Sequence, residues 1–149
     1  MTSMAPVVKS AGISASRNEV WGALTESDII AQWMGGARVQ SKWELGGDIT
    51  FTGKLLKRTY RDRGTVLAIE REKLLKYNHS SGLSHLQDAP ENRSMITFSL
   101  DCTGENTRLT VRHERFREEA VYRHANYFWG FALTELKHLL EGCAQRLRI

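Results

Sequence analysis

Three side chains near the ends of two predicted strands have the chemistry of a recognition or acid–base site: Tyr77, His79 and His113. In the segments 73–79 and 106–113, apolar and polar residues alternate with the period of two typical of a strand with one buried face. This alternation puts all three side chains on the buried face. A tyrosine or histidine that faces a cavity could hydrogen-bond the polar end of a ligand or transfer a proton.

A structural role is the commoner one for such residues, because a histidine at a strand end usually satisfies its ring with backbone groups or water. The five histidines lack metal-ligand spacing with one another or with cysteine. No serine–histidine–aspartate order, phosphate-binding glycine loop or nucleotide fingerprint is present. We therefore assign no catalytic residue and expect no metal and no cofactor.

The first part of the chain predicts one strand and two short helices. The apolar segment 7–13 predicts an edge strand, preceded by a short tail over residues 1–6. Ser16 and Glu19 have the spacing of a capping box, which predicts a helix start. Thr25 and Asp28 repeat this spacing and predict a second short helix, which Gly35 and Gly36 would close.

From residue 37 to 113 the period of two predicts six more strands, with a surface loop at 80–93 that could cover an opening. The expected strands are 38–43, 48–55, 59–71, 73–79, 94–101 and 106–113. Gly46 and Gly47 predict one turn, and residues 104–106 predict a tight hairpin. We expect another turn near Lys57 and a bulge at Gly64 within one long strand.

A long helix over residues 118–146 organises the chain. Apolar residues at Val121, Ala125, Phe128, Ala132, Leu136, Leu139 or Leu140 and Cys143 form one stripe. Such a helix would run roughly 40 Å and could cross a whole sheet. Gly130 stands among four aromatic residues at 127–131, where it could leave a notch with room for a ligand.

Composition predicts one ordinary globular domain over residues 1–149, since 41% of the residues are apolar. The net charge of +4 is scattered and does not indicate nucleic-acid binding. The absence of a signal peptide and of a long apolar run predicts a cytoplasmic protein without a membrane span. Cys102 and Cys143 show no pairing pattern and are expected to be small buried residues in a reducing compartment.

These elements describe an α+β domain in which a curved antiparallel sheet of six or seven strands wraps around the last helix. Four phrases carry a resemblance to known proteins: residues 20–25 (VWGALT), 31–34 (AQWM), 43–47 (WELGG) and 64–67 (GTVL). The chain resembles the helix-grip superfamily of START-related and polyketide-cyclase-like proteins. Within that superfamily it is most similar to bacterial relatives of the activator of the heat-shock-protein-90 ATPase.

The resemblance implies a cavity between the sheet and the long helix, and strand alternation predicts its walls. The predicted ligand-binding residues are Trp33, Phe51, Tyr77, His79, Phe98, Val111, His113, Phe128, Trp129 and Leu133. For Trp33, sealing the core is the alternative to rimming an entrance. A chamber of this mostly apolar kind is typical of small-molecule sites.

Three functions follow from this prediction. The favoured one is binding of a hydrophobic or aromatic small molecule in the cavity. The second is a cyclase or dehydratase-like enzyme, in which His79, His113 or Tyr77 does acid–base work on a polyketide-like substrate. The third is a co-chaperone that stimulates a chaperone ATPase, as the resemblance implies. Pairing of edge strands into a homodimer is an arrangement that the sequence allows but does not require.

Overall fold

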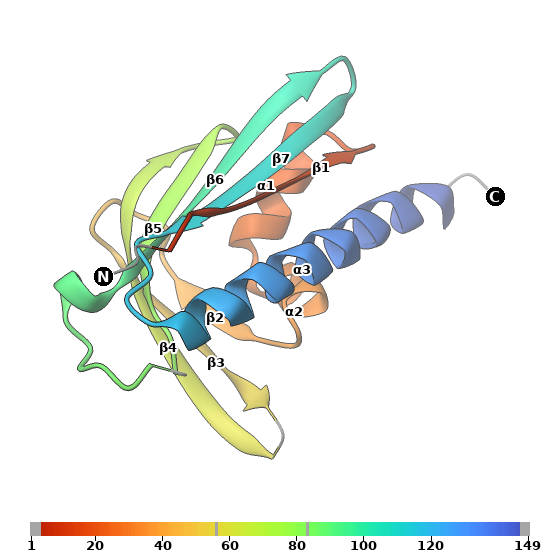
Figure 1. The fold of residues 1–149 in the computed structure, drawn as a ribbon. Coiled ribbons are helices and arrows are strands. Elements are labelled where there is room, and N and C mark those ends of the chain that lie inside the picture. Colours follow the sequence, from red (N-terminus) through yellow and green to blue (C-terminus); the bar gives the residue numbers. More distant parts are fainter. Residues whose placement is uncertain (1–3, 56, 83, 147–149) are drawn as a thin grey trace.

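One antiparallel sheet of seven strands carries three helices on one of its sides (Figure 1). The computed structural model describes residues 4–55, 57–82 and 84–146. The strand order is β1-β7-β6-β5-β4-β3-β2, so the first and last strands of the chain pair with each other. The structure confirms the predicted α+β helix-grip architecture, including two short helices after the first strand.

The strands are β1 (Val7–Ile13), β2 (Arg38–Ser41), β3 (Asp48–Leu55), β4 (Arg58–Glu70), β5 (Leu74–Ser80), β6 (Ser94–Thr103) and β7 (Asn106–Glu114). Strands β1 and β3 have the predicted bounds. Strand β2 ends before the predicted Trp43, whose φ of 52° turns the backbone away from an extended conformation.

Strand β4 is the single long strand that was predicted, and a turn residue at Lys57 with a φ of 68° precedes it. The predicted bulge position is wrong, because the pairing with β5 shifts register between Val66 and Ala68 and not at Gly64. Gly64 instead allows a close backbone approach. A Cβ atom at this position would lie 2.4 Å from the carbonyl oxygen of Asn78.

Helix α1 (Arg17–Thr25) begins with the predicted capping box. Ser16 Oγ accepts a hydrogen bond from the Glu19 amide at 3.2 Å, and the Glu19 carboxylate accepts one from the Ser16 amide. The predicted cap of α2 (Ser27–Trp33) is wrong. Its N-cap is Glu26, without a side-chain hydrogen bond. Thr25 still belongs to α1, and its hydroxyl donates to the Trp21 carbonyl at 2.9 Å.

Helix α3 (Glu119–Arg146) crosses the side of the sheet that also carries α1 and α2 (Figure 1). Among its described side chains, the buried ones are Ala125, Trp129, Ala132, Leu133 and Leu136. A short 3-10 turn, η1 (Pro90–Asn92), interrupts the loop before β6. Of the described helices, none has both the length and the apolar character needed to cross a membrane.

Two residues that were predicted to face the interior, Gly130 and Cys102, are exposed in the structure. Gly130 is exposed, and a Cβ atom there would meet nothing within 4 Å, so it forms no notch toward the sheet. Cys102 is exposed and not buried, because the tip of the β6–β7 hairpin extends beyond the core. The side chain of Cys143 lies outside the described residues.

Replacing Gly130 or Gly64 by alanine should have opposite effects on the stability of the fold. We expect Gly130→Ala to raise the free energy of unfolding by about 0.5–1 kcal/mol, because alanine restricts the unfolded chain and meets open space in the helix. We expect Gly64→Ala to lower it by about 1–3 kcal/mol, because the new Cβ would press on the Asn78 carbonyl. Urea unfolding of both variants measures the two effects. Equal effects in the two variants would contradict this assignment.

Candidate functional site

Six aromatic side chains form a closed ring between the sheet and α3, which we call the aromatic ring cluster. In order around the ring, its members are Phe51, Tyr77, Phe98, Trp129, His113 and His79. Neighbouring ring centroids lie between 5.3 Å and 6.2 Å apart, in tilted or T-shaped pairs. Strands β3, β5, β6 and β7 contribute the rings of the sheet, and α3 contributes Trp129.

Most of the other predicted cavity residues lie beside this cluster. Val111 is buried on β7 directly opposite Phe98, and Leu133 is buried one helical turn after Trp129. Phe128 is half-buried and contacts Trp129 at a centroid distance of 5.1 Å. Trp33 lies apart from the cluster: it is 1% exposed on α2, and its indole N–H donates to the Ala23 carbonyl at 2.8 Å. Trp33 therefore seals the contact between α1 and α2.

His113 joins α3 to the sheet through a chain of hydrogen bonds. The Trp129 indole N–H donates to His113 Nδ1 at 3.1 Å, and because an indole can only donate, Nδ1 must accept. His113 Nε2 therefore carries the proton and donates to Ser94 Oγ at 2.7 Å. The Ser94 hydroxyl donates in turn to the His79 carbonyl at 3.3 Å.

This environment holds His113 in its neutral form. Burial, and then the nearby His79 and His124, lower the pKa of His113 to about 3 from its ordinary value of 6.5. Protonation would also remove the acceptor that the Trp129 indole uses. Both ring nitrogens of His113 are thus engaged in holding the fold.

His79 is bonded differently, although it occupies the equivalent inward position on β5. Its Nε2 lies 3.1 Å from Asp62 Oδ2, and the other carboxylate oxygen of Asp62 accepts from the Gly82 amide at 2.6 Å. His79 Nδ1 has no partner, and it is the only such buried side-chain nitrogen or oxygen among the residues that the structure describes. The site therefore contains one free polar atom among aromatic rings.

Tyr77 completes the polar groups of the cluster. It is 2% exposed, and burial, followed by the negative charge of Asp62, raises the pKa of its hydroxyl above the ordinary value. The phenol is therefore neutral and cannot serve as a proton acceptor in the way that a phenolate would.

A small hollow of about 20 Å³ lies at the end of the ring cluster, beneath residues 81–82 and 84–93. It is lined by His79, Ser80, Ser81, Ser84, Gln87, Asn92, Ser94, Phe116, Arg117, Glu118 and Val121. This volume accommodates about one water-sized group. Most of its lining residues are polar, in contrast to the aromatic cluster that it adjoins.

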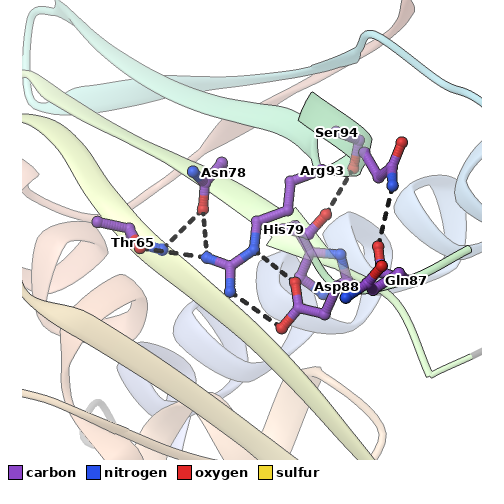
Figure 2. A network of polar contacts seen from close by, with 8 residues as sticks. Thr65, Asn78, His79, Gln87, Asp88, Arg93 and Ser94 are labelled. Carbon is purple, nitrogen blue, oxygen red and sulfur yellow. Dashed lines mark hydrogen bonds and ion pairs between the residues drawn. The ribbon is translucent and has the colours of Figure 1, made fainter. Parts of the chain in front are cut away.

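The segment 84–93 is held by side-chain and backbone contacts at both ends. The Arg93 guanidinium forms two contacts with the Asp88 carboxylate, at 2.8 Å and 3.1 Å, and also donates to Asn78 and Thr65 on the strands below (Figure 2). The hydrogen bond from Arg93 holds the pKa of the Asp88 carboxyl below its ordinary value. At the other end, the Ser84 hydroxyl and the His85 amide donate to the Glu118 carboxylate, just before α3. The segment therefore bridges the sheet and the start of the helix over the hollow.

A second, open depression of about 810 Å³ runs along the edge of β3. Strand β2 pairs with β3 only as far as Thr52, so the rest of β3 has no neighbour on that side. Its lining includes three basic side chains and is formed by Gly35, Gly36, Arg38, Thr52, Gly53, Lys54, Thr59, Tyr60 and Arg61. No pattern in the sequence predicts this open depression.

Sequence reasoning also missed Asp62 and Ser94. Ser94 is 5% exposed, and the alternation of Ile96 and Phe98 extended by two residues would have placed it on the inner face. Within residues 4–55, 57–82 and 84–146, no three His, Cys, Asp or Glu side chains are arranged to hold a metal ion.

Comparison with known proteins adds the following findings. The model of the family "Activator of Hsp90 ATPase homolog 1-like protein" matches residues 14–141. No curated protein sequence matches significantly. A solution structure from Cytophaga hutchinsonii is similar at 28% identity and a TM-score of 0.79, over 97% of this chain and 99% of the other.

Two further solved structures share the fold at lower identity. The Aha1 dimer from Colwellia psychrerythraea is 21% identical with a TM-score of 0.73, over 93% of this chain and 97% of the other. CalU16 from Micromonospora echinospora is 20% identical with a TM-score of 0.72, over 92% of this chain and 74% of the other.

The neutral state of His113 predicts a pH dependence of stability. The unfolded chain protonates this histidine near pH 6.5, whereas the folded chain does so only near pH 3. Between these values the unfolded state binds more protons, so the free energy of unfolding falls as the pH is lowered, by about 1.4 kcal/mol per pH unit for this group. Urea unfolding between pH 7 and 5 measures the slope.

The matched variants for this measurement are His113→Asn and His138→Asn. The first removes the His113 ring and should reduce the slope, leaving the part that comes from other groups such as His124, whose pKa is also lowered by burial. It should also lower the stability throughout. The second changes an exposed histidine on α3 and should keep the wild-type slope. An unchanged slope in His113→Asn would contradict the assignment.

Proposed function

The chain belongs to the Activator of Hsp90 ATPase homolog 1-like family, and we propose that it binds a hydrophobic, aromatic small molecule between the sheet and α3. The observation that carries this proposal is the aromatic ring cluster, in which rings from four strands and one helix pack against one another in a closed circuit. Aromatic walls with a few polar groups are typical of small-molecule sites.

Binding would require the cluster to open. Its rings pack against one another, and the adjoining hollow of about 20 Å³ takes only a water-sized group. Phe128 lies at the edge of the cluster and is half-buried, so its rotation would need little rearrangement of the core. The segment 84–93 covers the hollow through side-chain contacts, which could break without disrupting the sheet.

Two of the three buried tryptophans, Trp129 and Trp33, allow a test within one molecule. We expect 1-methoxynaphthalene, a neutral two-ring ether, to shift the indole N–H signal of Trp129 in a ¹H–¹⁵N correlation spectrum. The reason is that this N–H bonds to His113 inside the ring cluster. The Trp33 signal should stay in place, because its N–H bonds to the Ala23 carbonyl outside the cluster.

The variants Trp129→Phe and Trp33→Phe assign the two signals. A saturating titration that leaves the Trp129 signal unmoved would contradict binding in the cluster. Equal shifts of the indole signals of all four tryptophans would indicate nonspecific association instead.

Acid–base chemistry on a polyketide-like substrate, the enzymatic alternative, would have to use His79. Both ring nitrogens of His113 are hydrogen-bonded, and the Tyr77 phenol is held neutral by its raised pKa. A neutral Tyr77 phenol could donate a proton but not accept one, so His79 would have to be the base of such a reaction.

Stimulation of a chaperone ATPase is the second candidate, favoured by family membership and by one surface feature. Tyr127 and Phe131 are 77% and 50% exposed, and they stand one turn apart on the solvent face of α3. Two exposed aromatic residues on one helix face suit contact with a protein partner.

We expect this chain to raise the ATPase rate of the cognate Hsp90-type chaperone, and the double variant Tyr127→Ser/Phe131→Ser to weaken the effect about tenfold or more. The control is Leu45→Ser, which removes an apolar side chain that is 71% exposed at a turn. A titration of ATPase rate against each variant measures the effect. Absence of any stimulation by the wild-type chain would rule out this candidate.

A further inference from the structure

His79 presents an unsatisfied hydrogen-bond acceptor inside the aromatic ring cluster. Buried polar atoms in folded proteins are nearly always paired, so an unpaired one calls for an explanation. His79 Nδ1 is the only buried side-chain nitrogen or oxygen without a partner in the described part of the chain. The ring lies 5.3 Å from Phe51 and 6.2 Å from His113, centroid to centroid.

The hydrogen bonds of Asp62 determine what His79 Nδ1 can bind. An ionised carboxylate only accepts, so the neutral ring carries its proton on Nε2, which faces Asp62 at 3.1 Å. The Gly82 amide donates to the other carboxylate oxygen at 2.6 Å and fixes its orientation. In the neutral form of His79, Nδ1 is therefore left with a lone pair, and its partner is a hydrogen-bond donor.

The surroundings of His79 define the size and chemistry of that donor. On one side His79 contacts the rings of Phe51 and His113, which would pack against a flat apolar group. It also lines the hollow of about 20 Å³, which has room for a group as large as one hydroxyl. The combination suits a donor carried by an aromatic ring.

We propose that His79 Nδ1 accepts a hydrogen bond from the hydroxyl group of an aromatic, phenol-type ligand, with Asp62 as the positioning residue that fixes the histidine tautomer. This inference rests on the proposed binding function and specifies its ligand class. A plain hydrocarbon or an ether of the same shape leaves Nδ1 unpaired. A hydroxylated ring satisfies it.

The test compares 1-naphthol with 1-methoxynaphthalene by isothermal titration calorimetry. The two compounds share a ring system, but only the naphthol can donate. For the wild-type chain we expect naphthol to bind about tenfold more tightly, the effect of one hydrogen bond. In His79→Phe the two compounds should bind equally, and in the exposed control His138→Phe the preference should remain.

Asp62→Asn is a second variant that retains the histidine. The Gly82 amide would keep the asparagine oxygen, which turns the amide NH₂ toward His79 Nε2. His79 would then carry its proton on Nδ1 and become a donor, so the preference for naphthol over the ether should disappear. Thermal unfolding of each variant checks that it is folded.

The outcomes separate the two proposals. If neither compound binds the wild-type chain, the binding function itself fails. If both bind with equal affinity, the binding function stands and the role of His79 is overturned. Tighter binding of 1-naphthoate than of 1-naphthol would also overturn it, because a carboxylate requires a donor at Nδ1. A naphthol preference that survives in both His79→Phe and Asp62→Asn assigns the selectivity to another group.

Discussion

The contact between α3 and the sheet depends on the hydrogen-bond chain from Trp129 through His113 to Ser94. Aromatic packing alone is not directional enough to fix the rotation of a helix on a curved sheet, whereas a buried indole N–H must find an acceptor. His113 supplies that acceptor only while it is neutral. The position of Trp129, and with it the geometry of the ring cluster, therefore depends on the protonation state of one buried imidazole.

The same residue type has different roles at His79 and His113, and the difference comes from partners on other strands. Both histidines point inward near the ends of their strands, as the alternation predicted. The sequence could not distinguish them, because the indole that engages His113 comes from α3 and the carboxylate that engages His79 comes from β4. The role of each histidine is therefore decided by its contacts with residues that are distant in sequence.

Asp62 shows why one part of the site was not predictable. Strand β4 was expected as one long strand, and its alternation counted back from Val66 would have put Gly64 and Asp62 on the inner face. Counted back from Ile69, which pairs with Leu75, the alternation puts Leu67 inward and Asp62 outward. The register shift between Val66 and Ala68 explains why the two counts disagree. One extra residue there reverses the faces of the strand, so the count from Val66 holds for the part that contains Asp62. A bulge of this kind leaves no clear mark in the sequence.

The two candidate functions use opposite faces of one helix, and this makes them physically compatible. Ala125, Trp129 and Leu133 face the sheet, while Tyr127 and Phe131 face solvent. A helix turn moves as a unit, because its backbone hydrogen bonds hold neighbouring residues together. A ligand that entered the ring cluster and displaced Trp129 would therefore also shift the exposed aromatic pair. The helix α3 is thus the element that the two candidate sites share.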